Sequence, residues 1–185
     1  MDYSFSINHS ENDFIAACVA NESWAQKKLY VEHYPRMMAI CMRYAKNEQD
    51  ALDILHEGFI KVFKNIGKYS PGTSFTSWLS RIMINTAIDA YRKNTRRRTE
   101  DLEQVYDAKS LDPDIISLIS AEEIIGCLQD LTYSYRTVFN MYVIEGYSHR
   151  EIAESLGITE STSRSNLVKA RAKLKALLYK RRILE

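Results

Sequence analysis

A stretch near the carboxyl end, from Ser148 to Leu167, has residue types and spacing that suit contact with nucleic acid. Ser148 can cap the start of a short helix, and Glu151, three residues later, completes a capping box. Gly157 supplies the left-handed backbone that a tight turn between helices needs, and Thr159 can cap the next helix. This spacing predicts a helix-turn-helix.

The second helix of this motif presents short hydrogen-bonding side chains mixed with cations. Such groups suit base edges and flanking phosphates in the major groove of DNA. The candidate DNA contacts are Ser161, Thr162, Arg164, Ser165, Asn166, Lys169, Arg171 and Lys173. An ordinary hairpin of two helices is the structural alternative. The motif favours DNA binding but does not specify a family.

The rest of the chain predicts the helical scaffold that would position these groups. The 185 residues are 45% hydrophobic with only 6 Gly and 3 Pro, which excludes a disordered or collagen-like chain and allows two small domains. Apolar residues recur at helical spacing over 24–41, 52–63 and 75–91, and again from about Ile115 onward. A polar stretch ending at Asp112-Pro113 indicates a break.

We therefore predict an all-α protein of two small helical domains joined by a flexible linker. The expected bounds are 1–23 for an amino-terminal extension, 24–98 for the first domain, 99–114 for an acidic linker and 115–185 for the second domain. A short helix around 14–19 is expected in the extension.

The net charge of +1 conceals an uneven distribution along the chain. Basic residues cluster over 92–98 and 164–182, and between the two clusters lies an acidic segment, from Thr99 to Leu131, in which Lys109 is the only base. Basic helices suit phosphate contacts, because each neutralised phosphate releases condensed counterions. Solvated helix faces are the alternative, and the charge pattern alone leaves both interpretations open.

Several functional classes lack support in the sequence. Cys18, Cys41 and Cys127 are far apart and form no CxxC pair, so they are expected to be small buried residues in a reducing compartment. The histidines have no metal-ligand spacing, and the serines lack an evident catalytic base. We expect no catalytic residues, no metal and no cofactor. No apolar run reaches a membrane span and no secretory signal is visible, which predicts a soluble cytoplasmic protein.

Three blocks in the amino-terminal half identify a family. The first runs from Trp24 to Pro35, the second from Asp50 to Phe63, and the third reads F-x-x-W-L-x-R-I-x-x-N-x-x-x-D-x-x-R from Phe75. In order and spacing they resemble region two of bacterial sigma factors of the extracytoplasmic-function (ECF) group. The helix-turn-helix falls where that family has region four, with no region three before it. The resemblance covers almost the whole chain.

The second block carries an acidic stripe on one helix face, formed by Asp50, Asp53 and Glu57. Such a stripe is usually solvated surface, whereas the resemblance implies a docking site for the clamp helices of RNA polymerase. The polymerase-binding candidates are Asp50, Leu52, Asp53, Glu57, Phe59 and Ile60. His56 stands where the family often has Gln, and Gly58 inside a helix costs about 1 kcal/mol relative to Ala.

The third block and the loop before it combine aromatic and hydrogen-bonding groups that suit single-stranded DNA. The candidates here are Lys68, Tyr69, Ser74, Phe75, Arg81, Asn85, Arg92 and Lys93. Phe75 and Trp78 fit either base stacking or the protein core, and for Trp78 we favour the core.

The resemblance implies a sigma factor that binds core RNA polymerase through its clamp helices and flap. The first domain would capture the melted minus-ten element, and the second would read the duplex minus-thirty-five element. The acidic linker would thread toward the polymerase active site. An anti-sigma factor is an expected partner, and the free protein is expected to be a monomer.

The alternative is a stand-alone helix-turn-helix regulator that binds duplex DNA without polymerase. A serine recombinase would need a catalytic α/β domain, which this helical sequence does not predict.

Overall fold

The computed structural model describes residues 11–70, 73–95 and 121–183, and these are helices and short connections with no strand among them. The all-α prediction is confirmed for these residues. The expected acidic linker, 99–114, lies outside the described residues, as do residues 1–10 of the extension. The helices in chain order are α1 (Glu11–Val19), α2 (Ser23–Tyr44), α3 (Glu48–Asn65), the 3₁₀ turn η1 (Ile66–Lys68), α4 (Phe75–Thr95), α6 (Ala121–Gln129), α7 (Tyr133–Phe139), the π-helical turn η2 (Asn140–Ile144), α8 (His149–Leu156) and α9 (Glu160–Ile183).

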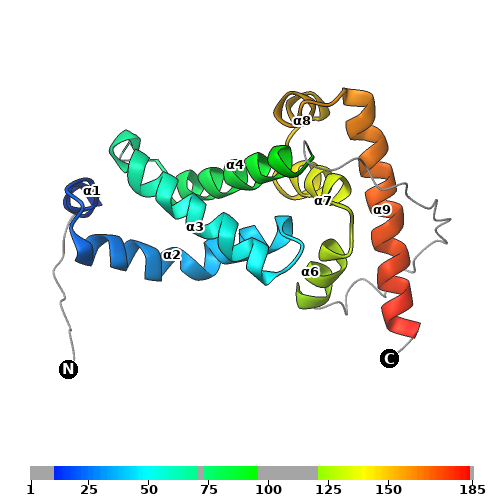
Figure 1. Ribbon diagram of the computed structural model, residues 1–185, viewed down its shortest axis with the longest axis horizontal. Coiled ribbons are helices and arrows are strands. Elements are labelled where there is room, and N and C mark those ends of the chain that lie inside the picture. Colours follow the sequence, from blue (N-terminus) through cyan, green and yellow to red (C-terminus); the bar gives the residue numbers. More distant parts are fainter. Residues whose placement is uncertain (1–10, 71–72, 96–120, 184–185) are drawn as a thin grey trace.

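Helices α2, α3 and α4 pack against one another and form the amino-terminal domain (Figure 1). Helix α3 begins at the Asn47 cap, whose side-chain oxygen accepts a hydrogen bond from the Asp50 backbone N–H at 2.8 Å. Its buried face includes Ile54, Leu55 and Val62, and burying each such side chain stabilises the fold by about 1.5–3 kcal/mol. The same helix therefore turns its acidic residues outward.

Helix α1 is part of the amino-terminal domain and covers one end of it. It contacts the start of α2 and the η1 turn, and Ile15 and Cys18 are buried in the common core. A helix near the expected 14–19 is confirmed, beginning at Glu11. Because η1 leads into the loop before α4, α1 supports the base of that loop.

The carboxyl-terminal domain consists of α6, α7, η2, α8 and α9. The long helix α9 packs against α6, α7 and α8, and its inner side buries Leu167, Ala170 and Leu174. Cys127 and Leu128 of α6 close this core from the other side.

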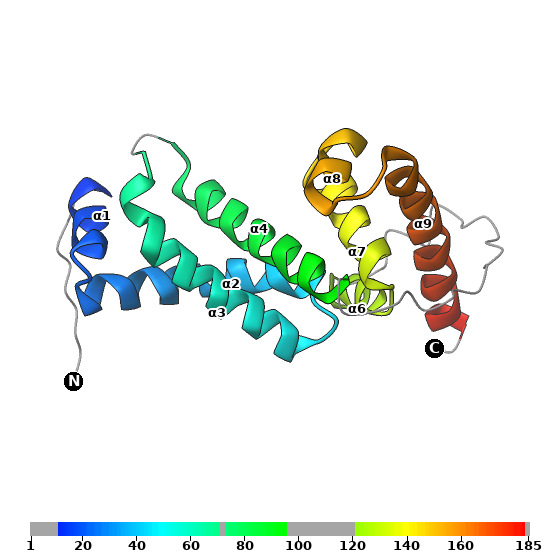
Figure 2. The ribbon, with the colours of Figure 1, turned by 45° about the horizontal axis from the view of Figure 1, so that its top comes forward.

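The two domains are in direct contact. Figures 1 and 2 both show α6 and α7 beside the carboxyl ends of α2 and α4, and contacts between these elements agree with both views. Val138, Met141 and Ile152 of the second domain belong to the same buried cluster as residues of α2 and α4. The hydrophobic core is thus continuous across the domain boundary.

Candidate nucleic-acid interface

The helix-turn-helix has the capping geometry that its sequence predicts. The Ser148 hydroxyl accepts a hydrogen bond from the Glu151 backbone N–H at 3.2 Å, and the Glu151 carboxylate accepts one from the Ser148 N–H at 2.8 Å. Hydrogen bonds donated to the Glu151 carboxylate by the Ser148 backbone N–H and by its hydroxyl lower the pKa of Glu151. Gly157 has φ of 69°, the left-handed conformation the turn requires, and the Thr159 hydroxyl accepts from the Thr162 N–H at 3.0 Å. The predicted motif is confirmed.

Helix α9 presents a polar, cationic face to solvent at its amino-terminal half. Ser163 and Leu167 face inward, whereas most of the candidate DNA contacts face outward. The exposed candidates are Ser161, Thr162, Arg164, Ser165, Lys169 and Arg171, while Asn166 and Lys173 are half-buried. Arg164 is already ion-paired with Glu160, one turn earlier on the same helix.

Sequence reasoning missed Val168, which is 67% exposed on the same helix. It follows Arg164 by four residues and Ser165 by three, so helical spacing alone would have placed it beside them. An exposed valine among polar groups provides an apolar surface of the kind that contacts a thymine methyl in the major groove.

His149 ties α8 to α9. Its Nδ1 lies 2.9 Å from the hydroxyl of buried Ser163, and its ring stacks on Tyr142 with centroids 4.4 Å apart. The Arg171 guanidinium also lies over the Tyr142 ring, 6.0 Å from its centroid. Burial and the nearby Arg164 and Arg171 lower the pKa of His149, while Glu160 opposes this shift. These contacts connect the first residue of α8 to η2 and to α9.

An aromatic cluster stands behind the loop that precedes α4. The rings of Phe75 and Trp78 stack with centroids 5.8 Å apart, and Tyr69 packs edge-on to Phe75 at 4.9 Å. Tyr69 is only 5% exposed, and its hydroxyl donates to the Thr73 carbonyl at 2.6 Å. Trp78 is half-buried against the core, in line with the core interpretation. Tyr69, predicted to contact the melted strand, thus has a buried ring in this structure and a hydroxyl that is hydrogen-bonded to the loop.

Arg81, Asn85 and Arg92 lie along one exposed stripe of α4, and Lys93 is exposed beside it. Ser74 starts the helix by accepting a hydrogen bond from the Ser77 N–H at 3.3 Å. The loop candidate Lys68 is also exposed at the other end of the loop. Arg81, Asn85 and Arg92 therefore share one face of α4, and Arg92 also contacts the second domain.

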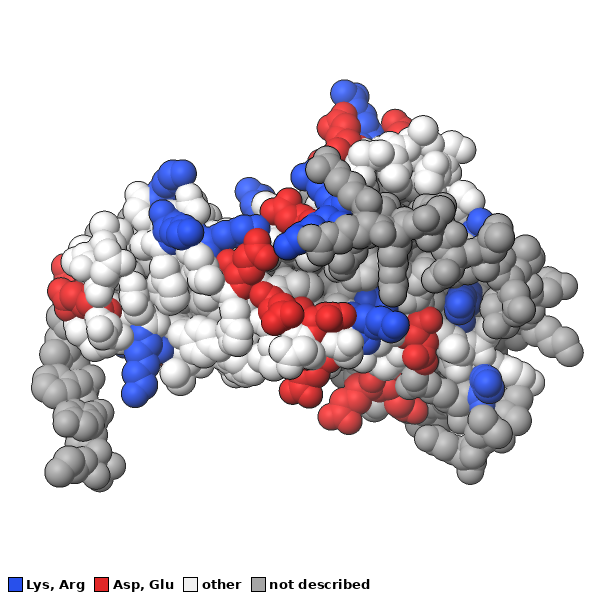
Figure 3. All heavy atoms as spheres, viewed as in Figure 1, with Lys and Arg blue, Asp and Glu red and all other residues white. Residues whose placement is uncertain are grey.

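Helix α3 exposes the acidic stripe expected from the sequence. Asp50, Asp53 and Glu57 are solvent-exposed, and Figure 3 shows acidic side chains gathered over this part of the molecule. Ile60 is 53% exposed and Leu52 half-buried beside them. The remaining polymerase-binding candidate, Phe59, is only 2% exposed, and its ring lies 4.6 Å from that of Tyr30.

Phe59 is therefore a core residue in this structure, where the sequence had suggested a contact surface. Its place one residue after Gly58 turns it to the inner side of α3, toward α2. It can influence a partner only by holding the exposed part of the helix in position.

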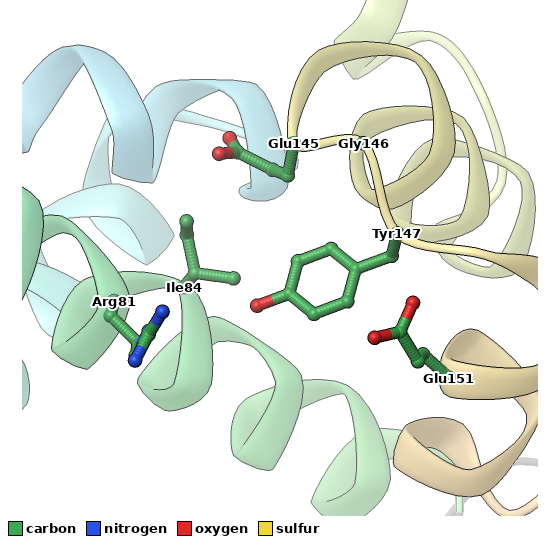
Figure 4. Close-up of a pocket in the computed structure, with 6 residues that line it drawn as sticks. All are labelled: Arg81, Ile84, Glu145, Gly146, Tyr147 and Glu151. Atoms are coloured by element: carbon green, nitrogen blue, oxygen red, sulfur yellow. The ribbon is translucent and has the colours of Figure 1, made fainter.

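A cleft opens between α4 and the start of α8, at the boundary of the two domains. Figure 4 shows the Tyr147 ring projecting from the connection between η2 and α8 toward α4, with Arg81 on the facing helix. The residues lining the cleft are Arg81, Ile84, Glu145, Gly146, Tyr147 and Glu151. A candidate DNA-binding arginine thus faces a lining that includes two carboxylates.

Metal ligands and membrane spans are both lacking in the described part of the chain. No group of three or more His, Cys, Asp or Glu side chains is placed there to hold a metal ion. Among the described helices, none has the length and apolar character to cross a membrane.

Comparison with known proteins gives two family matches in chain order. Residues 29–97 match sigma-70 region 2, and residues 121–174 match sigma-70 region 4. The chain is 34% identical over 167 residues to the ECF RNA polymerase sigma factor SigE of Mycolicibacterium smegmatis; the match covers 87% of this chain and 63% of that protein. It is 31% identical over 147 residues to the ECF sigma factor EcfG of Rhodopseudomonas palustris, covering 78% of this chain and 80% of that one.

A solved structure also aligns with the fold. It is the sigma factor RpoE from Bartonella quintana in complex with the anti-sigma factor NepR, with a TM-score of 0.49, 18% identity, and coverage of 83% of this chain and 96% of that chain. The two regional matches and the curated relatives agree with the resemblance identified in the sequence. The chain belongs to the ECF group of the sigma-70 family of RNA polymerase sigma factors.

Proposed function

We propose that this chain binds core RNA polymerase and directs it to promoters, with domains at 24–98 and 115–185. One observation carries the proposal: a single chain presents two DNA-compatible surfaces of different chemistry. Helix α9 offers polar and cationic groups on a rigid helix, as duplex recognition needs, and α4 offers a polar stripe beside an aromatic-backed loop. The two family matches support the same assignment.

In this proposal α9 reads the duplex minus-thirty-five element. Ser161, Thr162 and Ser165 are near its amino-terminal end, where recognition helices contact base edges. Lys169 and Arg171 lie further along and suit phosphates, and Val168 supplies an apolar contact. Arg164 can serve either role once it leaves Glu160.

The amino-terminal domain then holds the melted minus-ten strand. Arg81 and Asn85 supply hydrogen-bonding groups on α4, and Phe75 supplies a partly exposed ring at the start of the helix. Lys68 and Ser74 flank the loop, which buried Tyr69 holds in place. Extracting a base from the duplex takes a few kcal/mol, so polymerase must contribute to opening.

The exposed acidic stripe binds the polymerase clamp helices. It consists of Asp50, Asp53 and Glu57, with Ile60 as its apolar neighbour. Complementary charge at such a surface chiefly accelerates association and selects the partner. The carboxyl-terminal domain contacts the flap. The chain acts as a non-enzymatic initiation factor in the cytoplasm, as a monomer when free, and an anti-sigma factor regulates it, in keeping with its family.

A capture experiment distinguishes this function from a stand-alone regulator. Genomic fragments are incubated with the tagged chain, with or without core RNA polymerase, and the retained DNA is sequenced. We expect enrichment of fragments sharing two spaced elements only when core polymerase is present. Equal enrichment by the chain alone, centred on one duplex element, would contradict the proposal and favour the regulator.

A further inference from the structure

The loop between η1 and α4 is described at both of its ends, residues 69–70 and 73–74, and it begins on a rigid base. Ile66 of η1 is 1% exposed, and its carbonyl accepts a hydrogen bond from the Tyr69 N–H at 3.0 Å. Helix α1 packs on η1, and Cγ2 of Val19 lies 3.7 Å from where a Cβ on Gly67 would be. Backbone and apolar contacts therefore hold the first residues of the loop.

The Tyr69 ring is buried in a cluster of aromatic side chains from two helices. Phe75 and Trp78 of α4 have their ring centroids 4.9 and 5.6 Å from that of Tyr69. His33 of α2 packs edge-on against Phe75, with centroids 5.5 Å apart. A phenylalanine ring would make the same contacts, so ring packing does not explain why residue 69 carries a hydroxyl. The partner of that hydroxyl does.

The Tyr69 hydroxyl joins the start of the loop to its end. It donates a hydrogen bond to the Thr73 carbonyl at 2.6 Å, four residues further along the chain. Tyr69 is 5% exposed, and a buried hydroxyl without a partner is not compensated for the water contacts that it has lost. Burial of the ring therefore favours the loop conformation that brings the Thr73 carbonyl to the hydroxyl.

Thr73 makes a second connection across the loop. Its hydroxyl donates to the Ser70 carbonyl at 2.9 Å, and its N–H donates to the same carbonyl at 3.4 Å. The next residue, Ser74, starts α4 by accepting a hydrogen bond from the Ser77 N–H. Thr73 is thus held from both sides, through its carbonyl and through its hydroxyl, at the point where the loop enters the helix.

These hydrogen bonds set the direction of the peptide between Thr73 and Ser74. The described residues contain no cis peptide bond, so the Thr73 C=O and the Ser74 N–H point to opposite sides of the chain. Because the carbonyl points to buried Tyr69, the Ser74 N–H points away from the aromatic cluster. Ser74 is exposed and Phe75 is partly exposed. The two hydroxyls therefore determine how these candidate contacts are presented to a DNA strand.

A loop that is ordered before binding holds an advantage over one that is ordered by its ligand. Fixing the backbone of each residue costs conformational entropy, and a complex that orders a loop as it forms is weakened by that amount. Hydrogen bonds within the protein that already hold the loop remove part of this cost. They strengthen binding without touching the DNA.

We propose that Tyr69 and Thr73 are positioning residues whose hydroxyls form a clasp that orders this loop for capture of the melted minus-ten strand. They act through Ser74 and Phe75, which lie at the entry to α4. The clasp takes the place of the direct DNA contact that the sequence predicted for Tyr69. The inference rests on the function proposed above, because that function supplies the single-stranded ligand.

Hydrogen exchange of the free chain, followed by NMR, tests the clasp itself. Tyr69→Phe removes the hydroxyl and keeps the ring, and thermal unfolding checks that the variant is folded. We expect the Thr73 and Ser77 N–H groups to exchange several-fold faster in Tyr69→Phe than in the parent. Tyr34→Phe is the matched control, because it removes a hydroxyl from an α2 side chain that packs on Tyr30, outside the cluster. Equal exchange rates in the parent and both variants would overturn the clasp.

Binding of promoter DNA tests the positioning role. The probe is a fragment from the capture experiment with mismatched bases across its minus-ten element, bound by the chain together with core polymerase. We expect Tyr69→Phe and Thr73→Ala to weaken this binding about 3- to 10-fold, the effect of losing one hydrogen bond. Thr73→Ser keeps the hydroxyl donor and should retain the parent affinity. Parent affinity in either Tyr69→Phe or Thr73→Ala, or an equal loss in Thr73→Ser and Thr73→Ala, would overturn the positioning role.

Two further affinities separate positioning from a general loss of structure. These are the affinity for core polymerase and the affinity of the polymerase complex for a duplex fragment that keeps only the minus-thirty-five element. Both should be the same in the parent and in every variant. A parallel loss in these affinities would reduce the clasp to a structural role and overturn the inference.

The parent chain separates this inference from the proposed function. With core polymerase, it should bind the mismatched probe more tightly than the matched duplex. If it does so and the hydroxyl variants behave like the parent, the positioning role fails and the proposed function stands. A parent chain without this preference would contradict minus-ten capture and the positioning role together, even where hydrogen exchange shows the clasp.

Discussion

The backbone of Gly58 in α3 lies against the side chain of Met83 in α4. A Cβ built on Gly58 would overlap Sδ of Met83 and lie 3.1 Å from its Cε. Met83 is fully buried, so a Cβ at Gly58 would force its side chain to shift within the core. The glycine that looks unfavourable within a helix is therefore what lets α3 and α4 approach closely.

Replacing Gly58 by Ala should lower the free energy of unfolding. The substitution gains about 1 kcal/mol of helix propensity, but overpacking a well-packed core typically costs about 1–3 kcal/mol. Urea unfolding of Gly58→Ala, Met83→Ala and the double variant measures the coupling. The change at Gly58 should be neutral or stabilising when Met83 is Ala, and an equal loss in both backgrounds would contradict the contact.

Removing Arg136 should strongly destabilise the protein. Arg136→Leu leaves four carbonyls without this donor, three of them in buried hydrogen bonds, so we expect a loss of about 3 kcal/mol or more in the free energy of unfolding. The Arg150 side chain is 80% exposed, so Arg150→Leu should change the free energy of unfolding by less than about 0.5 kcal/mol. Similar effects of the two variants in chemical denaturation would refute the structural role.

His149 should make the carboxyl-terminal domain sensitive to mild acid. Its pKa is lowered in the fold by burial and by Arg164 and Arg171, so folding favours the neutral ring. The stabilisation that the neutral ring gives to the fold is complete above about pH 6.5, the pKa of histidine in the unfolded chain. It is lost as the pH falls through the lower pKa of His149 in the folded protein. NMR titration should give a His149 pKa below that of a free histidine. His149→Gln should flatten the pH dependence of stability in this range, and a pKa at or above the free value would be inconsistent with the geometry.

Arg164→Ala should weaken promoter recognition without weakening polymerase binding. Removing one base or phosphate interaction from a recognition helix costs about 1–3 kcal/mol, or roughly 5- to 150-fold in promoter affinity. Lys180→Ala, exposed near the far end of the same helix, is the control and should have little effect. Undiminished promoter-dependent transcription by Arg164→Ala would remove Arg164 from the interface.

Asp53→Lys should reduce affinity for core RNA polymerase, mainly by slowing association. Asp53 is the better test residue, because Asp50 also interacts electrostatically with Arg136. Glu32→Lys makes the same charge change at an exposed position on α2 and should retain normal affinity. Indistinguishable association rates for the two variants in a polymerase titration would argue against the acidic stripe as the docking site.

Local features could be predicted from the sequence because their determinants lie within a few residues. The Ser148–Glu151 capping box, the left-handed Gly157 and the Thr159 cap each depend on residues at most a few positions apart. Helical periodicity likewise predicted α4 from Phe75 onward.

Features set by distant contacts could not be predicted. The Arg136–Tyr44 hydrogen bond joins residues 92 positions apart, and the space at Gly58 depends on Met83 in another helix. Phe59 was expected to contact polymerase because it lies in the second sigma-like block, and Tyr69 was expected to contact DNA because it lies in the loop before the third block. Their burial depends on how α2 and the aromatic cluster pack against them.

Run-off transcription tests the central claim most directly. The purified chain and bacterial core RNA polymerase from its own source are mixed with the fragments captured in the binding experiment, and the transcripts are sequenced. We predict discrete transcripts that require the chain, start downstream of two spaced elements and diminish with Arg164→Ala. No chain-dependent transcript, together with tight duplex binding in the absence of polymerase, would contradict the assignment.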